Sequence, residues 1–581
     1  MHDRYRWRTK LIREQIAVIN GKKSPSILLK NATYLNQALR KWIKANIWIY
    51  EDRIVYVGSN LPEMTTKTEI VDCENKFIVP GYIEPHVHPF QLYNPHTFAQ
   101  YASQSGTTTL ISDNLMFALL LPKKKAFSLI EDLHKLPSSM YWWCRYDPQT
   151  EIPGEGEAQI FSPENIKDWL EHDLVIQGGE LSSWPKVLDG DDLLLHYMLE
   201  TKRLRKPIEG HFPGASEKTL TKMRLIGVDC DHESMSGKDV YMRLSQGYVT
   251  SLRYSSIRPD LPKMLDEILE LGIDQFDRLI FTTDGSPPAF YKDGVIDKMI
   301  KIALDKGIPE IDAYNMASYN IAMHYGMDHL HGMIGPGRIA HLNILDDKRN
   351  PTPISVIAKG KWVLRDGVPV VHVESFPWEK YDLVPQKIDW DLTMDDLQFS
   401  MPFGMEMINS VIMKPYSIGF DVSIDELPTD HDESFLMLVD KNGRWRINTV
   451  IKGFANKVSG FASSYSNTGD FVLIGKSKTD MLTAFNRMKE IGGGLVLVEN
   501  NEVIHEIKLE LHGIMSTENL EQLIKEESEL FRLLQERGYK FVDPVYTLLF
   551  LSSTHLPYIR LTPQGIFDVM KKTVLFPSIM R

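Results

Sequence analysis

Between residues 77 and 283 the chain alternates short apolar runs with stretches whose apolar residues recur at helical spacing. Short buried strands that alternate with helices are typical of parallel βα units. Eight such units favour closure into a (β/α)8 barrel, and an open doubly wound sheet is the alternative. The predicted strands cover residues 77–83, 107–112, 140–145, 173–177, 206–209, 226–230, 248–252 and 279–283.

Segments with the alternation of β-strands flank this region on both sides. Four precede it, at residues 26–29, 45–49, 53–58 and 69–72. Two more, at 342–345 and 355–364, follow Gly335-Pro336-Gly337. We expect both groups to pair into one composite β-sandwich domain that flanks the inserted barrel.

A third region begins at about residue 388, with predicted strands at 450–454, 471–475 and 495–498 and a helix at 480–491. Gly492, Gly493 and Gly494 lie between that helix and the last strand. No Lys-Ser or Lys-Thr follows them, so we favour a turn over a phosphate-binding loop. The predicted fold class is therefore α/β, with these parts: an N-terminal helical extension (1–25), the composite β-domain (26–78 plus 338–385), the barrel (79–337) and a C-terminal α/β domain (386–581).

The composition is that of a folded chain long enough for several compact units. Of its 581 residues, 43% are hydrophobic and 24% charged, and the net charge of -12 argues against nucleic-acid binding. One run near the N-terminus is basic, but acidic neighbours make a solvated helix face the preferred interpretation. That run consists of Arg4, Arg6, Arg8, Lys10 and Arg13.

The cysteines predict neither a disulfide framework nor a thiolate metal site. Cys73, Cys144 and Cys230 are widely spaced and form no CxxC pair. No segment approaches the ~20 apolar residues of a membrane span, and the N-terminus lacks the apolar run of a signal peptide. We therefore expect a cytoplasmic protein with neither nucleic-acid nor membrane partners.

The first chemical signal is a pair of histidines, His86 and His88, at the end of the first predicted strand. Positions i and i+2 of a strand point the same way, so both imidazoles can face one metal ion. The spacing alone is weak, because His329 and His331 share it. These two lie before Gly332 in a polar connection, where we expect a solvated turn.

Further candidate ligands follow later strands of the predicted barrel. In a (β/α)8 barrel the positions after the strands converge on one face, where active sites of this fold lie. Imidazole and carboxylate groups bind Zn, Mn or Fe, and one bridging carboxylate would reduce the repulsion between two cations. For each residue alone, a barrel-mouth histidine or a helix N-cap remains an alternative. The candidates after the later strands are Glu180, His211, His232 and Asp284.

Such a site supports hydrolysis, because paired metals lower the pKa of a bound water towards ~7 and polarise the electrophile. A neighbouring carboxylate must take the proton of the water and return one to the leaving group. Asp284 is the candidate for this role. Glu233 is a second candidate, for protonating a substrate nitrogen, although a salt bridge to Lys or Arg would explain it equally well.

The motifs around these residues resemble those of the amidohydrolase superfamily and, within it, the adenine deaminase family. The stretch from residue 79 to 88 reads VPGYIEPHVH and looks like the family's first-strand motif. The resemblance continues outside the barrel, so it covers nearly everything after about residue 26. The other similar segments are Gly179-Glu180-Leu181, residues 210–214, 231–233, 283–284, 335–340, 491–496 and 513–516.

The resemblance implies hydrolytic deamination of adenine to hypoxanthine and ammonia, by a binuclear centre of Mn, Fe or Zn. One metal would be held by His86, His88 and Glu180, and the other by Glu180, His211 and His232, with Asp284 moving the proton and touching a metal. Barrels of this kind commonly form homodimers. The expected partner is a small purine base.

Three segments depart from the usual family motifs. Residues 89–92 read PFQL where Ile-Glu-Ser-Ser is usual, and residues 112–116 read SDNLM where Asp-Pro-His-Glu is typical. After Ser463-Ser464 the chain reads YSNTGD in place of His-Asp-Ser-His-Asn. Losing groups that hydrogen-bond one base can change the substrate without abolishing hydrolysis. The alternatives are therefore another purine, a pterin or a cyclic amide as substrate, or a purine-binding protein without catalysis.

Overall fold

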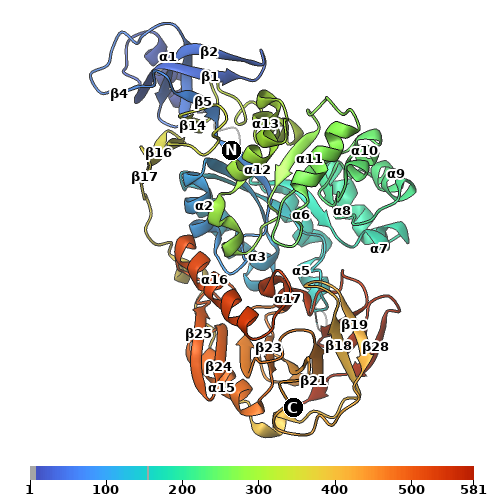
Figure 1. Cartoon of the computed structure of the whole chain (residues 1–581). Helices are drawn as coiled ribbons and strands as arrows, with labels where there is room; N and C mark the ends of the chain where they lie inside the picture. Colours follow the sequence, from blue (N-terminus) through green and yellow to red (C-terminus); the bar gives the residue numbers. More distant parts are fainter. Residues whose placement is uncertain (1–7, 153–155) are drawn as a thin grey trace.

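The computed structural model describes residues 8–152 and 156–581, and three parts of the chain are arranged in a row (Figure 1). A β-rich part built from the N-terminal strands and a later segment lies at one end. A ring of strands and helices from residues 82–324 forms the middle. The C-terminal part, orange to red in Figure 1, packs on the opposite side of this ring.

The middle part is the predicted (β/α)8 barrel. Its strands follow one another in chain order, every neighbouring pair runs parallel, and the eighth strand returns to lie beside the first. The strands are β6 (Tyr82–Val87), β7 (Thr107–Asp113), β8 (Ser139–Cys144), β9 (Val175–Leu181), β10 (Ile208–Gly210), β11 (Cys230–Asp231), β12 (Val249–Arg253) and β13 (Leu279–Thr282). The alternative of an open doubly wound sheet is therefore wrong.

The helices of the barrel cover the outside of the strands because each presents one apolar stripe inward. In α11 the buried residues Leu261, Met264, Leu265 and Ile268 recur at intervals of three and four. The main barrel helices are α2 (Pro95–Gln104), α4 (Lys123–His134), α6 (Pro163–Glu171), α8 (Asp192–Arg203), α9 (Glu217–Ile226), α10 (Gly237–Ser245), α11 (Leu261–Glu270) and α12 (Ile296–Asp305).

The single strand predicted over residues 77–83 is two strands. Residues Phe77–Pro80 form β5, which pairs with strands of the β-rich part, and the barrel begins only at Tyr82. Gly81 lies at the crossing, where a Cβ would meet the side chains of Thr108 and His341. The continuous apolar run hid this change of sheet because both strands are buried.

The β-rich part is one composite sheet, to which both the early and the late strands contribute. Within the described residues its nine strands form a single hydrogen-bonded array in which the late strand β14 pairs with β5. Strands of both groups contribute to one apolar core. The strands are β1 (Ile27–Asn36), β2 (Lys41–Tyr50), β3 (Arg53–Gly58), β4 (Glu69–Asp72), β5, β14 (Leu342–Leu345), β15 (Ser355–Ala358), β16 (Lys361–Arg365) and β17 (Val368–Pro369).

The C-terminal part has a mixed sheet with helices against it. Helix α15 (Lys478–Glu490) packs on the sheet, and Gly492 and Gly493 form the turn into β24, so the glycines connect helix and strand as predicted. Two further helices, α16 (Leu520–Glu536) and α17 (Pro544–Phe550), lie towards the barrel (Figure 1). The strands in sheet order are β19 (Met413–Ser417), β18 (Phe403–Met407), β21 (Trp445–Lys452), β20 (Glu433–Val439), β23 (Phe471–Gly475), β22 (Gly460–Ser463), β24 (Gly494–Glu499) and β25 (Glu502–Lys508), and β29 (Ile579–Met580) pairs with β21.

The N-terminal segment forms helix α1 (Thr9–Ile19). Arg8 precedes the helix, Lys10 and Arg13 lie on it, and all three are exposed, in agreement with a solvated face. Arg4 and Arg6 lie outside the described residues. None of the helices in the described parts of the chain has the length and apolar character needed to cross a bilayer.

Candidate metal centre

The predicted ligands converge at the C-terminal end of the barrel strands. Parallel strands bring the residues at these ends to one face of the barrel. All of these side chains are buried except for small exposed fractions of His88 and His211. They lie at the following places: His86 within β6, His88 after it, Glu180 within β9, His211 after β10, His232 after β11, and Asp284 two residues after β13.

His86, His88 and Asp284 form one group of candidate ligand atoms. Asp284 Oδ1 lies 3.3 Å from His86 Nε2 and 3.5 Å from His88 Nε2. Glu180 Oε2 lies 3.7 and 3.8 Å from the same two nitrogens. Atoms so spaced can surround a single ion at the ~2.0–2.2 Å typical of nitrogen and oxygen ligands.

His211 and His232 form a second group with the other oxygen of Glu180. Glu180 Oε1 lies 2.8 Å from His211 Nδ1 and 3.6 Å from His232 Nε2. Glu233 Oε1 lies 3.6 Å from both of these nitrogens. Glu180 therefore presents one oxygen to each group, which is the geometry of a bridging carboxylate.

One buried atom at this centre favours metal binding. Among the described residues, His86 Nε2 has no partner in hydrogen-bond geometry, although carboxylate oxygens of Asp284 and Glu180 lie 3.3 and 3.7 Å from it. Buried polar atoms nearly always have a hydrogen-bond partner, so an imidazole nitrogen that faces carboxylates without one points to a cation between them. Imidazole nitrogen and carboxylate oxygen are donors that Zn, Mn and Fe accept. The side chains therefore fit a pair of divalent cations.

Two carboxylates that the sequence interpretation did not select hold the histidine rings. Glu209 lies 3.0 Å from His86 Nδ1 through one oxygen and 3.0 Å from His232 Nδ1 through the other. Asp113 Oδ2 lies 2.8 Å from His88 Nδ1. A carboxylate on Nδ1 favours the tautomer that leaves the Nε2 lone pair for a metal.

Glu209 had a detectable sequence signal, because it stands two residues before His211 and so faces the same side of the strand. Glu84 stands likewise two residues before His86. It is fully buried and accepts hydrogen bonds from the backbone nitrogen and hydroxyl of Thr283 at 2.9 and 2.6 Å. Glu84 thereby fixes the segment that leads into Asp284.

Arginines determine the charge state of the acidic groups. Burial raises the pKa of Glu180, but the charge of Arg145, 2.8 Å away, outweighs it and holds that pKa well below its usual range. Arg253, 2.9 Å from Asp284, likewise holds the pKa of Asp284 well below its usual range against the effect of burial. Both carboxylates are therefore ionised and ready to face cations.

Glu233 forms salt bridges to arginines, which is the alternative that its sequence position left open. Its oxygens lie 2.5 Å from Arg253 Nη1 and 3.1 Å from Arg258 Nη1. Burial raises the pKa of Glu233, but His211 and these arginines lower it to about 2. Because each oxygen of Glu233 contacts an arginine, neither is free to protonate a substrate nitrogen.

Asp284 has a backbone conformation that few residues adopt. Its φ of 57° is left-handed, and it is followed by Gly285 with a φ of 62°. Aspartate tolerates this region better than most residues, and glycine adopts it freely. A Cβ on Gly285 would collide with the backbone nitrogen of His88. The tight turn therefore brings Asp284 against the histidine pair.

The expectation for His329 and His331 is only partly met. Both lie in a turn region, but His331 is buried, so the prediction that it is solvated is wrong. Tyr141 Oη lies 2.9 Å from His331 Nε2, and the ring stacks on His341. The polar sequence around His331 gave no sign that the turn folds against the barrel.

A cavity of about 800 Å³ opens over the ligand cluster. His88, Glu180, His211 and Asp284 line it on the barrel side. The opposite wall comes from the C-terminal part, a position that no sequence pattern predicted. That wall includes residues 409–412, Asn467, residues 540–542, Tyr546, and residues 555–557. The volume falls within the range of ~300–1,000 Å³ typical of small-molecule sites.

Two of the segments that depart from the family motifs meet beside this cavity. Tyr465 is fully buried, and its hydroxyl donates to Oε1 of Gln91. Gln91 itself lines the cavity. Asn467, from the same C-terminal segment, donates to the hydroxyl of Ser553. The unusual residues therefore bond one another at the substrate side of the centre.

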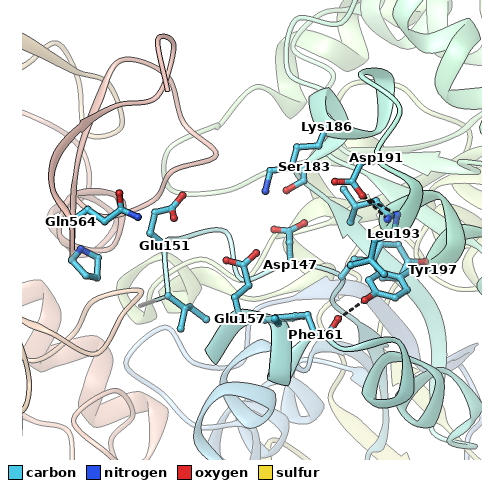
Figure 2. A pocket seen from close by; sticks show the side chains of 15 residues that line it. Asp147, Glu151, Glu157, Phe161, Ser183, Lys186, Asp191, Leu193, Tyr197 and Gln564 are labelled. Atoms are coloured by element: carbon cyan, nitrogen blue, oxygen red, sulfur yellow. Dashed lines mark hydrogen bonds between the residues drawn. The ribbon is translucent and has the colours of Figure 1, made fainter. Parts of the chain in front are cut away.

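A second pocket, of about 550 Å³, lies elsewhere and contains none of the predicted ligands. Figure 2 shows the carboxylates of Asp147, Glu151 and Glu157 facing the side where Lys186 lies. Burial raises the pKa of Glu157, and the nearby charge of Lys186 opposes this shift. This pocket brings together none of the histidines of the centre, so the chemistry belongs to the larger cavity.

Comparison with known sequences agrees with this centre. The sequence pattern of the Amidohydrolase family matches residues 77–363, and that of the Adenine deaminase C-terminal domain matches residues 414–573. A protein of Halalkalibacterium halodurans named "Putative adenine deaminase" is 61% identical over 579 residues, covering 100% of this chain and 99% of the relative. The chain belongs to the adenine deaminase family.

Other members of the family are similar over the same length. A Bacillus subtilis protein, also named "Putative adenine deaminase", is 56% identical and covers 99% of each chain. A Kosmotoga olearia protein named "Adenine deaminase" is 27% identical, with 96% of this chain and 97% of the relative covered. Family membership thus extends over the barrel, the composite sheet and the C-terminal part together.

Solved structures similar to this chain cover less of it. The β-aspartyl dipeptidase of Fervidobacterium islandicum matches with a TM-score of 0.47 and 18% identity, covering 60% of this chain and 100% of that chain. The N-acetylglucosamine-6-phosphate deacetylase of Pasteurella multocida matches with a TM-score of 0.44 and 15% identity, covering 58% and 99%.

Proposed function

We propose that this protein is a metal-dependent hydrolase that deaminates adenine, converting adenine and water to hypoxanthine and ammonia. The observation that carries the proposal is Glu180, whose two oxygens each face a pair of histidines. Relatives that match the whole chain at 56–61% identity carry the name of an adenine deaminase. The location we propose is the cytoplasm, in agreement with three buried thiols that form no disulfide.

The proposed centre binds two divalent cations, of Mn, Fe or Zn. His86, His88, Asp284 and one oxygen of Glu180 would hold the first, and His211, His232 and the other oxygen of Glu180 the second. When bound, such cations lower the pKa of a water molecule and polarise the electrophile. Glu209 and Asp113 orient the rings through their Nδ1 atoms.

Within this centre we assign the proton transfers to Asp284. Its carboxylate is ionised, lies beside both histidines of the first group and lines the cavity. It can accept a proton from the attacking water and return it to the amino group that leaves as ammonia. Glu233, paired with two arginines, would stay charged and place its negative charge beside His211.

A second candidate substrate class is another purine, a pterin or a cyclic amide. The exchanged residues Gln91 and Tyr465 favour this alternative, because they bond each other at the side of the cavity where the substrate would lie. The hydrolytic chemistry would be the same on either substrate.

The test combines metal analysis with ammonia release over a panel of purines, pterins and cyclic amides. We expect the purified chain to bind two divalent ions per protomer and to release ammonia from adenine. Glu180→Gln should lower metal content and activity together, and Asp284→Asn should lower activity by at least ~100-fold, the lower range for a proton-transfer group.

Glu157→Gln is the matched control, because Glu157 belongs to the second pocket (Figure 2). This variant should keep both metal and activity. Unchanged metal content and activity in the Glu180 and Asp284 variants would contradict the assignment. Release of ammonia only from a pterin or cyclic amide would favour the second substrate class.

A further inference from the structure

Three arginines line the cavity over the centre, and they differ in how their guanidinium groups are used. Arg253 donates through Nε to Ser255 and contacts Glu233 and Asp284 through its two Nη atoms. Arg258 likewise uses all three of its nitrogens, on Asp260, Glu233 and the carbonyl of Ser234. Both groups are therefore fully occupied by the protein.

Arg145 is only partly occupied. Its Nε lies 3.0 Å from each oxygen of Asp113, its Nη2 lies 2.5 Å from Asp113 Oδ2, and the same Nη2 lies 2.8 Å from Glu180 Oε2. Its Nη1 has no hydrogen-bond partner in the described part of the chain, although the side chain is only 1% exposed. Arg145 lines the cavity.

An unused buried N–H of a charged group is costly, so such groups nearly always have a partner. The Asp113 carboxylate already fixes the position of the Arg145 side chain, and another orientation would break that bidentate pair. A ligand in the cavity is the partner that remains. Because a guanidinium can only donate, the ligand must offer an acceptor atom at that point.

We propose that Arg145 is a specificity-determining residue whose Nη1 donates to an acceptor atom of the substrate ring. The inference rests on the proposed function, in which that acceptor is a ring nitrogen of adenine. Because the adjacent Nη2 contacts Glu180, the bonded nitrogen would lie next to the centre. Arg145 would then link substrate position to the bridging carboxylate.

The position of Arg145 in the fold agrees with a role on the substrate. Arg145 directly follows β8, so it stands at the C-terminal end of a barrel strand, where residues of this fold act on substrates. No other guanidinium lining the cavity has an unused nitrogen among the described residues.

The test compares the apparent affinities of adenine and of its 1-deaza, 3-deaza and 7-deaza analogues for the metal-loaded protein, from the KM of each base that is deaminated and the inhibition constant of each base that is not. Each analogue lacks one ring acceptor. We expect one of them to bind on the order of 10- to 100-fold more weakly than adenine, as for a hydrogen bond to a charged donor. Arg145→Lys keeps a positive charge but lacks the two Nη atoms of the guanidinium. In this variant adenine and that analogue should bind equally.

The comparison is made between ligands within each variant, so a change in metal content alters all the affinities together and leaves their ratio intact. Metal content is measured alongside. Arg243→Lys is the matched control, since Arg243 is a buried guanidinium paired with Asp231 and lies outside the cavity lining. This control should keep the preference of the unaltered protein.

Two results would overturn the inference while leaving the proposed function intact: equal binding of all four bases to the unaltered protein, or the same preference in Arg145→Lys. If the unaltered protein neither binds adenine nor releases ammonia from it, the proposed function fails and the inference fails with it. A purely structural role of Arg145 would lower stability in Arg145→Lys without changing the ratio of affinities.

Discussion

Glu209 is expected to control metal affinity, because its two oxygens hold one histidine of each group by the Nδ1 atom. Its Oε2 and Oε1 each lie 3.0 Å from an Nδ1 atom, of His86 and His232 respectively. The side chain is only 2% exposed, so water cannot replace a lost contact. The informative change is Glu209→Gln, which keeps the shape and removes the charge and one acceptor.

In Glu209→Gln the amide oxygen can accept from one ring only, while the amide NH2 faces the Nδ1–H of the other. That ring must change its tautomer or its orientation, and either change removes its Nε2 lone pair from the metal. Loss of such a supporting carboxylate typically costs about 10- to 100-fold in metal affinity, or about 1.4–2.7 kcal/mol. The expected result is one weakened ion and one retained ion per protomer.

The assay is competition with a chelator, followed by metal analysis after each step. Glu527→Gln is the control, because Glu527 is a buried glutamate on α16 whose carboxylate accepts from the backbone nitrogen of Ala289 and forms no ion pair with a histidine of the described chain. The control should release both ions at the chelator concentrations of the unaltered protein. If Glu209→Gln does the same, the two rings are held by something other than Glu209, and the reasoning is refuted.

Three further outcomes are expected. Burial, with the nearby charge of Asp543, raises the pKa of Glu527 to about 8. In the unfolded chain this carboxyl loses its proton at a lower pH than in the folded chain, so stability should fall as the pH rises from about 4.3 to 8. Glu527→Gln should flatten that part of the profile of Tm against pH. Gly285→Ala should displace the backbone at His88 and reduce metal content, measured by metal analysis, while Gly272→Ala, where a Cβ meets nothing within 4 Å, should leave metal content unchanged. Arg560 donates to three backbone carbonyls, including that of Val411 at the cavity; Arg560→Met should cost about 1–3 kcal/mol in chemical denaturation and raise KM more than it lowers kcat.

The barrel could be predicted from sequence because its strands are short, fully buried runs separated by amphipathic helices. The bounds failed where a strand is very short. The run predicted over residues 226–230 begins in the last turn of α9, and only Cys230 and Asp231 form the strand. Leu225, in that same turn, is 83% exposed, so an apolar residue there does not mark a buried strand.

The histidines and acids of the centre could be recognised because each stands at or just after a strand, a local property. Glu209 and Asp113 were missed because their role is to contact another ligand and not the metal. The far wall of the cavity could not be predicted at all. It comes from segments more than 100 residues beyond the last barrel strand, which reach the barrel only through packing of α16, α17 and the mixed sheet.

Residues from two of the segments that depart from the family motifs bond each other in the structure. Gln91 and Tyr465 are 374 positions apart, and both are buried, yet the hydroxyl of one donates to the amide of the other. A buried polar group that replaces another must find a new partner or cost about 1–3 kcal/mol. Exchanges that bond one another avoid this cost, and they alter the substrate side of the cavity while the histidines and carboxylates of the metal centre stay in place.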